Sequence, residues 1–161
     1  MRHTTALPYV RSSLRGQLRE SFLVIIGIIA LFSPVSGVSG DLSVGLFLGS
    51  HHKQDAFWCG EARRLYNEDN PGLYIVFPNG LVIGRYENSE SGCDGAKYST
   101  LLGYETRLND YWSVTAGIAD GYTDDNDFNG YLPLASINLK VGIFKIWYGY
   151  TVAGFGLEFD L

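Results

Sequence analysis

After position 40, the alternation of apolar and polar residues favours short β-strands over helices. Runs rich in Val, Ile, Leu, Tyr and Thr are separated by turn-forming residues, and none shows the apolar period of a long amphipathic helix. Eight strands are predicted, at Leu42–Ser50, Gly72–Phe77, Leu81–Ser89, Lys97–Arg107, Tyr111–Ala119, Tyr131–Leu139, Ile143–Tyr150 and Ala153–Asp160. The predicted fold class is therefore all-β.

The predicted connections alternate between short and long. Three tight turns have residues suited to hairpins, at Pro78–Gly80, Leu108–Asp110 and Lys140–Gly142. Longer polar segments lie between them, at His51–Pro71, Glu90–Ala96 and Asp120–Gly130. Short turns at one end and long loops at the other are typical of a bacterial outer-membrane barrel whose loops face outward. We therefore expect an eight-stranded antiparallel up-and-down barrel in the outer membrane, with a soluble β-sandwich or lipocalin-like barrel as the alternative.

The strand predicted at Tyr111–Ala119 indicates what such a barrel would enclose. Trp112, Val114, Ala116 and Ile118 lie on one face, and Ser113, Thr115, Gly117 and Ala119 lie on the other. A lumen lined by small and apolar groups suits a plugged or lipid-holding barrel better than a water-filled pore.

The first forty residues have the pattern of a secretory signal peptide. Arg2, Arg11, Arg15 and Arg19 precede the uncharged apolar run Phe22–Phe32, and small residues follow up to Gly40. The run is too short for a membrane-spanning helix, which needs about 20 residues. We predict a signal peptide at residues 1–40 and a barrel at residues 41–161; an uncleaved amphipathic or membrane-anchoring N-terminus is the alternative.

The net charge of the chain bears on its possible partners, and its two cysteines bear on the compartment in which it folds. Without residues 1–40 the chain keeps eight of its twelve Lys and Arg and sixteen of its seventeen Asp and Glu, a formal net charge of −8. Such a domain repels phosphate backbones, so nucleic acid is not expected as a partner. Cys59 and Cys93 would meet an oxidising compartment after export, and we expect a disulfide between them, with two free thiols as the alternative.

Histidine and serine residues meet at one predicted end of the barrel. His51 and His52 end the first strand, and Asn88 and Ser89 end the third, on the same side. An imidazole near a hydroxyl is the minimum needed for acyl transfer, since the base holds the hydroxyl proton during attack on an ester. Solvated loop residues without a catalytic role are the alternative.

Several short motifs in order resemble one family. Tyr66–Glu68 followed by Pro71–Gly72 resembles the segment that opens the second strand of the outer-membrane lipid A palmitoyltransferases. Further along, Tyr86–Ser89 resembles the strand that carries that family's Asp-Ser pair, Leu102–Tyr104 its next strand, and Leu132–Ser136 its sixth. Together the motifs cover nearly the whole predicted barrel.

This resemblance implies transfer of a palmitoyl chain from a phospholipid to the lipid A of lipopolysaccharide, without a metal or soluble cofactor. The family's catalytic histidine falls on His52, with His51 as the alternative, and its serine falls on Ser89. Its proline on the sixth strand, which leaves a gap for lateral access of lipid, falls on Pro133. Because a proline cannot donate to a strand ladder, the physical interpretation agrees.

The position of the family's aspartate is Asn88 in this chain. An amide cannot take a proton as a carboxylate does, so Asn88 would orient the histidine or donate to an oxyanion. Glu87 and Glu90 are nearby carboxylates, but strand alternation would point them elsewhere.

Glu105 falls where the family has the glycine at the floor of its acyl pocket. A buried carboxylate is costly without a partner, and we expect Arg107 or Arg85 to supply one. A shorter acyl chain, or none, is therefore expected.

Two other features favour structural interpretations. Asp125, Asp127, Asn129 and Gly130 match the opening of a calcium loop, but Ser136 replaces its bidentate glutamate, so an acidic surface loop is expected and no metal site. Aromatic belts at the membrane surfaces are predicted at Tyr111, Trp112, Trp147, Tyr148 and Tyr150.

The sequence leaves two hypotheses for function. The first is a monomeric outer-membrane acyltransferase that acts on phospholipid and lipopolysaccharide, with His52, Ser89 and Asn88 as its catalytic residues. The second is a catalytically silent barrel that acts as a surface structural or interaction protein. Asn88 and Glu105 favour the second hypothesis, and His52, Ser89 and Pro133 favour the first.

Overall fold

The computed structural model describes residues 40–91, 93, 96–122 and 130–161. The predicted signal peptide, apart from Gly40, lies outside these residues, as do Asp125, Asp127 and Asn129 of the calcium-like loop. In the described part of the chain, no helix is long and apolar enough to cross a membrane.

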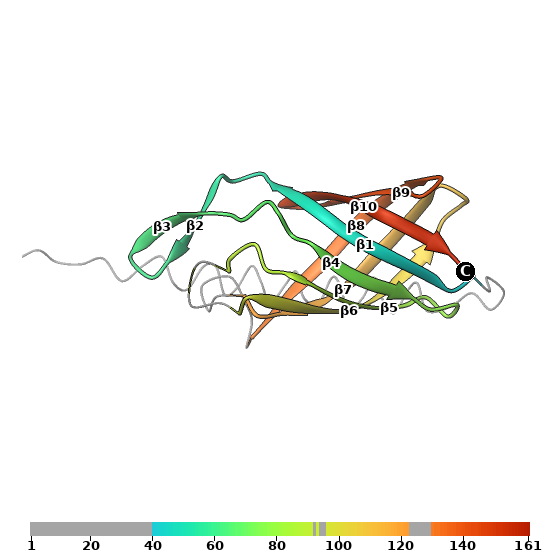
Figure 1. Cartoon of the computed structure of the whole chain (residues 1–161), viewed down its shortest axis with the longest axis horizontal. Helices are drawn as coiled ribbons and strands as arrows, with labels where there is room; N and C mark the ends of the chain where they lie inside the picture. The colour runs from blue at the N-terminus through green and yellow to red at the C-terminus, as the bar shows by residue number, and fades with distance from the viewer. Residues whose placement is uncertain (1–39, 92, 94–95, 123–129) are drawn as a thin grey trace, which may run out of the picture.

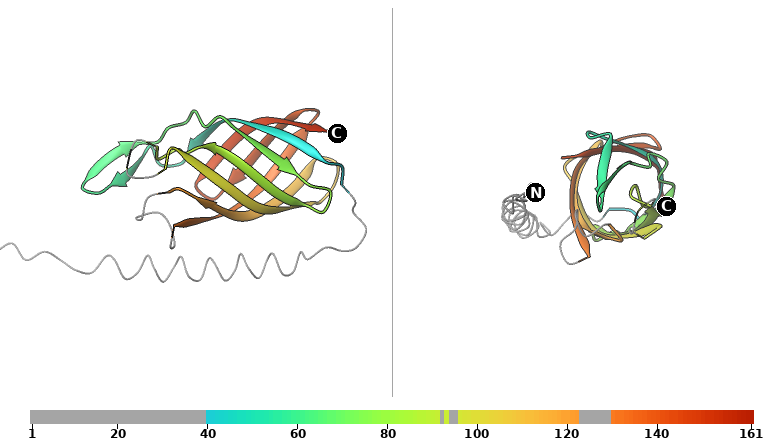
Figure 2. Two further views of the ribbon diagram at one scale, coloured as in Figure 1. Left: turned by 60° about the horizontal axis from the view of Figure 1, so that its bottom comes forward. Right: turned by 90° about the vertical axis from the view of Figure 1, so that its left-hand side faces the viewer.

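The described residues form ten strands, and eight of them close into an antiparallel barrel (Figure 1, Figure 2). The strands are β1 (Ser43–His52), β2 (Ala56–Cys59), β3 (Ala62–Leu65), β4 (Gly72–Val76), β5 (Leu81–Glu87), β6 (Tyr98–Arg107), β7 (Trp112–Asp120), β8 (Tyr131–Val141), β9 (Phe144–Gly149) and β10 (Val152–Asp160). The order around the barrel is β1-β10-β9-β8-β7-β6-β5-β4. The predicted all-β class and eight-stranded barrel are confirmed.

Two local predictions need correction. The segment His51–Pro71 contains the β2–β3 hairpin, which projects beyond the barrel in Figure 1. The turn predicted at Lys140–Gly142 lies later, because Lys140 and Val141 belong to β8 and pair with Lys145 and Phe144. Gly142 begins the turn with a φ of 61°, a conformation that glycine adopts without a steric penalty.

The start of β1 and the end of β10 lie at the same end of the barrel as the short turns. The amide of Gly40 donates to the carbonyl of Pro78, and the amide of Leu161 donates to the carbonyl of Leu42. The long connections and the β2–β3 hairpin therefore occupy the opposite end, as the alternation of loop lengths predicts. We call this the loop end of the barrel.

The ladder between β8 and β9 is incomplete at the loop end. Its first pair is Ser136 with Gly149, so β8 residues 131–135 pair only with β7. Pro133, which has no N–H to donate, lies in this stretch opposite Ile118 of β7. Because β9 ends at Gly149, the barrel wall is notched at the loop end beside this part of β8.

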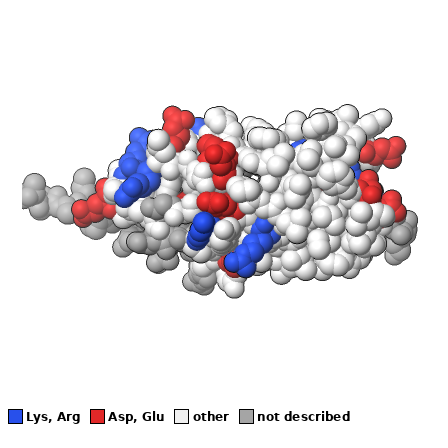
Figure 3. Space-filling view, viewed as in Figure 1, with Lys and Arg blue, Asp and Glu red and all other residues white. Residues whose placement is uncertain are grey.

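The outer face of the barrel is apolar over its middle. Large side chains exposed there include Leu46, Leu73, Ile83, Leu102, Ile137, Ile146 and Phe155. In Figure 3, uncharged atoms cover the middle of the visible face, and charged groups gather toward its two ends. Of the predicted belt aromatics, Tyr111, Trp112, Tyr148 and Tyr150 are exposed. Trp147 instead points inward, where its ring packs edge-on against Phe47 at 5.0 Å.

Candidate active site

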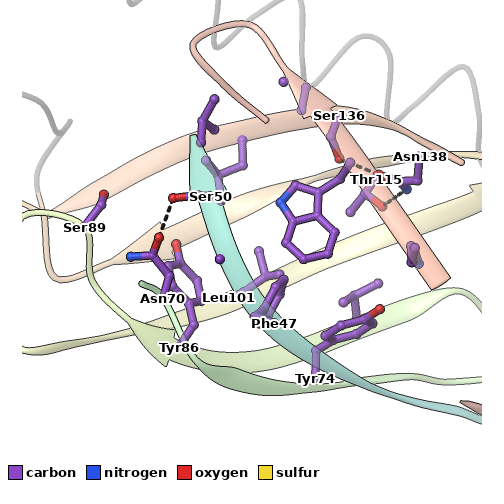
Figure 4. A pocket seen from close by; sticks show the side chains of 18 of the residues that line it. Phe47, Ser50, Asn70, Tyr74, Tyr86, Ser89, Leu101, Thr115, Ser136 and Asn138 are labelled. Atoms are coloured by element: carbon purple, nitrogen blue, oxygen red, sulfur yellow. Dashed lines mark hydrogen bonds between the residues drawn. The ribbon is translucent and has the colours of Figure 1, made fainter. Parts of the chain in front are cut away.

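A cavity of about 150 Å³ lies inside the barrel. Its apolar wall includes Phe47, Val82, Leu101, Leu134 and Trp147, each from a different strand (Figure 4). His52 and Ser89 line the same cavity, on segments that reach the loop end. The two residues that the sequence singled out for acyl transfer therefore line one cavity.

A β-bulge in β1 decides which of the two histidines faces the cavity. The register of β1 with β10 shifts between Phe47 and Gly49, which adds one residue to β1. Phe47 lines the cavity, so strict alternation would turn His51 inward; the extra residue turns Ser50 and His52 inward instead. His51 is exposed. Of the two alternatives left open by the sequence, His52 is the histidine at the cavity.

Glu68 holds the imidazole of His52 in place. Its carboxylate oxygens both lie 3.3 Å from His52 Nδ1, and the backbone amide of His52 donates to Oε1 at 3.1 Å. On its face, the imidazole stacks on Tyr66 with 4.0 Å between ring centres and 6° between planes. Burial, followed by Glu90 and Glu68, raises the pKa of Tyr66, so its ring stays a neutral phenol. An imidazole that donates from Nδ1 keeps a lone pair on Nε2 for proton transfer.

No catalytic role was predicted for Glu68 from the sequence. It stands sixteen positions after His52, across the hairpin, and belongs to a polar loop that shows no strand or helix period. Its position in the motif Tyr66–Glu68, close to a histidine-bearing strand end, is the signal that would have found it.

Ser89 follows β5 and is almost completely buried. Its side chain lies near the phenol of Tyr122, and the phenol oxygen of Tyr122 lies 2.8 Å from that of Tyr86. The carbonyl of Ser89 accepts from the amide of Asn67 at 2.8 Å, which ties the loop that carries Glu68 to the segment that carries Ser89. The catalytic candidates are thus positioned by one connected set of loop contacts.

Asn88 does not contact His52. Its side-chain amide donates to the carbonyl of Gly121 at 2.6 Å, and its Oδ1 accepts from the amide of Glu90 at 2.7 Å. Asn88 is fully buried and is not among the residues that line the cavity. Its contacts shape the segment next to Ser89, while Glu68 supplies the carboxylate beside the imidazole.

The predicted disulfide between Cys59 and Cys93 is confirmed, with 2.05 Å between the sulfur atoms. It joins the end of β2 to the loop that follows Ser89. Phe57 of β2 lies 4.9 Å from Tyr66, ring centre to ring centre, and Tyr66 is the ring that stacks on His52. The disulfide therefore ties a strand that packs beside the His52 imidazole to the loop after Ser89.

A buried charged cluster forms the floor of the cavity. Lys145 Nζ lies 2.8 Å from Glu105 Oε2 and 2.5 Å from Glu158 Oε2. Glu105 also accepts from Thr115 at 3.0 Å, and Tyr74 donates to Glu158 at 3.0 Å. The lumen is therefore polar at the loop end, apolar in its middle and ionic toward the turns, rather than small and apolar throughout.

The prediction that Arg107 or Arg85 pairs with Glu105 was wrong. Arg107 instead pairs with Asp160 at 3.5 Å, and Arg85 lies on the outer face of the barrel. Lys145 reaches Glu105 across the lumen from β9, a contact that joins residues 40 positions apart.

Within the residues that the structure describes, no group of three or more His, Cys, Asp and Glu side chains could hold a metal ion. No family model, curated protein or solved structure matches this chain.

Proposed function

We propose that this chain is an outer-membrane enzyme that transfers an acyl chain from a phospholipid to lipid A, the reaction of the family that its motifs resemble. The observation that supports this most directly is the position of His52 and Ser89 on one cavity whose wall is apolar. An acyl chain fits such a wall, and its ester would lie at the polar end of the cavity.

The outer face of the barrel supports a place in a bilayer. A closed barrel satisfies every backbone donor and acceptor between its strands, which is what a hydrocarbon environment requires. The exposed side chains over its middle, such as Ile83, Leu102 and Ile146, are those that lipid tails would cover. Short turns at one end and long loops at the other favour an orientation with the loops outside the cell.

The imidazole of His52 is suited to act as the base. His52 is the last residue of β1 and lies beyond the apolar band, among the loops. There burial lowers the pKa of its imidazole from 6.5, although Glu68 and then Glu90 oppose that shift. The neutral imidazole that results accepts a proton on Nε2 from the attacking hydroxyl, while Glu68 stabilises the imidazolium that forms. As the ester bond to the donor breaks, the same proton passes to the departing alcohol.

The notch in the barrel wall beside Pro133 offers a path for lipid to reach the cavity. Leu134 and Ala135, which belong to the stretch of β8 without a β9 partner, also line the cavity. A chain in the outer leaflet would therefore enter beside β8, past the end of β9.

The volume of the cavity favours a short chain. Apolar cavities of about 150 Å³ take up guests such as benzene, which corresponds to a chain segment of roughly six carbon atoms. The ionic floor at Glu105 stops deeper penetration, because an alkyl chain cannot replace its hydrogen bonds.

The first test is mass spectrometry of lipid A from cells that express the chain. We expect a mass gain equal to one acyl group, lost in His52→Ala and Ser89→Ala and reduced in Glu68→Gln. His51→Ala is the matched control, since it removes an exposed imidazole one residue away and should keep the modification. Lipid A without any mass change, despite folded protein in the outer membrane, would refute the enzyme.

A catalytically silent surface barrel is the second candidate. The observation that favours it is the engagement of the Asn88 side chain with backbone groups at Gly121 and Glu90, which holds that side chain away from the cavity in which an oxyanion would form. Unchanged lipid A in the experiment above would support this role, and the loops would then be tested for binding partners.

A further inference from the structure

The basic residues of the barrel divide into two groups. Arg107, Lys140 and Lys145, toward the short turns, each form salt bridges with carboxylates. Toward the loop end lie Lys53, Arg63, Arg64, Arg85 and Lys97, and within the described part of the chain none of these five forms a salt bridge. In an acidic protein, cations without carboxylate partners are available for an external anion.

Two of these cations converge on one exposed aromatic ring. Arg85 Cζ and Lys97 Nζ each lie 5.3 Å from the ring centre of Tyr98, so the two charges stand within twice that distance of each other. Strand alternation fixes their direction. Tyr86 and Leu101 line the cavity, so Arg85 and Tyr98 point to the outer face of the barrel. We call Arg85, Lys97 and Tyr98 the basic cluster.

The basic cluster lies next to the candidate active site along the chain and at the edge of the apolar band. Arg85 follows the exposed Ile83 on the same face of β5, and the carbonyl of Lys97 accepts from the amide of Asn88, the neighbour of Ser89. In Figure 3, basic side chains lie at the border between the uncharged middle of the barrel and its charged loop end. Cations in this position meet the headgroups of the leaflet, not its tails.

We propose that the basic cluster binds a phosphate group of the lipid acceptor and so holds that lipid against the outer wall beside Ser89. This inference rests on the proposed function, which supplies the acceptor and the membrane. Arginine and lysine both suit phosphate oxygens, and the ring of Tyr98 keeps the two cations beside each other without neutralising them. A lipid with a phosphate on its sugar headgroup satisfies both the cluster and the apolar band below it.

Glu87 is a carboxylate next to the basic cluster and should oppose phosphate binding there. It lies opposite Tyr98 in the β5–β6 ladder and on the same face of β5 as Arg85, yet it forms no salt bridge with the cluster in the described structure. Its carboxylate reduces the positive potential where the phosphate would bind. Glu87→Gln should therefore strengthen phosphate binding, while loss of either cation should weaken it.

The experiment measures binding of lipid A to the purified barrel in detergent micelles by native mass spectrometry, with no phospholipid donor present. Arg85→Gln and Lys97→Gln should each weaken binding about fivefold, and the double variant on the order of twentyfold. The matched control is Arg63→Gln with Arg64→Gln, which removes the same charge from the exposed β3 strand and should leave affinity unchanged. Heat-modifiable migration in gels checks that each variant is folded.

Two further ligands separate the possible sources of phosphate. Lipid A stripped of its phosphates should bind the wild-type barrel as weakly as the double variant, and inorganic phosphate should not displace bound lipid A. Equal binding of the stripped lipid, displacement by inorganic phosphate, or equal losses in the Arg63 and Arg64 control would overturn the inference. No acyl transfer occurs in this assay, so the binding result can be interpreted even if the chain proves to have no transferase activity. If the chain transfers an acyl group but binds lipid A equally well with and without phosphates, this inference is refuted and the proposed function is not.

Discussion

Removal of the ammonium from the floor of the cavity should strongly destabilise the barrel. Lys145 contacts two carboxylates, and the side chains of Lys145, Glu105 and Glu158 are 4%, 7% and 2% exposed. In Lys145→Met, Glu158 retains Lys140 at 3.2 Å, but Glu105 retains only neutral donors. Breaking a buried ion pair by removal of one partner costs about 3–5 kcal/mol, and one stranded carboxylate places this variant in that range.

A second variant separates charge from packing. Lys145→Met combined with Glu105→Gln removes one charge of each sign, and the glutamine oxygen can still accept from Thr115. We expect the pair to recover most of the loss, to within about 1–2 kcal/mol of the wild type. Lys53→Met, which makes the same change at an exposed site, should alter stability by about 0.5 kcal/mol or less.

The assay is urea unfolding of the refolded barrel in lipid vesicles, followed by tryptophan fluorescence, with stability taken from the midpoint at constant slope. The reasoning would be refuted if Lys145→Met cost less than about 1 kcal/mol, or if the added Glu105→Gln gave no recovery. Either result would mean that water, or a rearrangement of the lumen, stabilises the Glu105 carboxylate after its ammonium partner is lost.

Three further predictions concern other parts of the molecule. Reduction of the Cys59–Cys93 disulfide, which spans 34 residues, should lower the free energy of unfolding by at most about 3–4 kcal/mol. It should also speed amide hydrogen exchange in β2 and β3 more than in the barrel strands, and an equal increase in all strands would contradict this. Gly45→Ala should destabilise by more than about 1 kcal/mol, because its methyl would stand 2.0 Å from Tyr74 Cζ; equal midpoints in urea for variant and wild type would argue against that contact. In the proposed mechanism the neutral form of His52 is the base, and the pKa of its imidazole is lowered, so acyl transfer should decline with falling pH at a midpoint below 6.5. A midpoint above that value, measured as kcat/KM against pH, would contradict the role of burial.

The barrel was predictable because each strand carries its own local signal. All eight barrel strands lie within two residues of their predicted bounds, since runs of β-branched and aromatic residues end at turn-forming residues such as Asn79 and Gly80. The β2–β3 hairpin lacked that signal. Its second strand contains Arg63 and Arg64 and is exposed throughout, so no buried face produces an alternating pattern.

The site was predictable only in part, because its contacts join residues that are distant in the sequence. Strand ends placed His52 and Ser89 at one rim, but the bulge after Phe47 that selects His52 has no local signature. Likewise, neither strand alternation nor motif order reveals that Lys145 crosses the lumen to Glu105. A lysine on the inward face of a strand was the available signal, since such a charge requires a buried partner.

The closure of the barrel also constrains when it can fold. Ser43 of β1 hydrogen-bonds with Asp160 of β10, across 117 residues of chain. No stretch shorter than almost the entire barrel can form this seam, and such non-local pairing slows folding. Until β10 arrives, β1 and β9 each present an open edge that can pair with other chains. A newly made chain therefore remains prone to aggregation until its last strand is synthesised, and it depends on shielding of those edges up to the moment of closure.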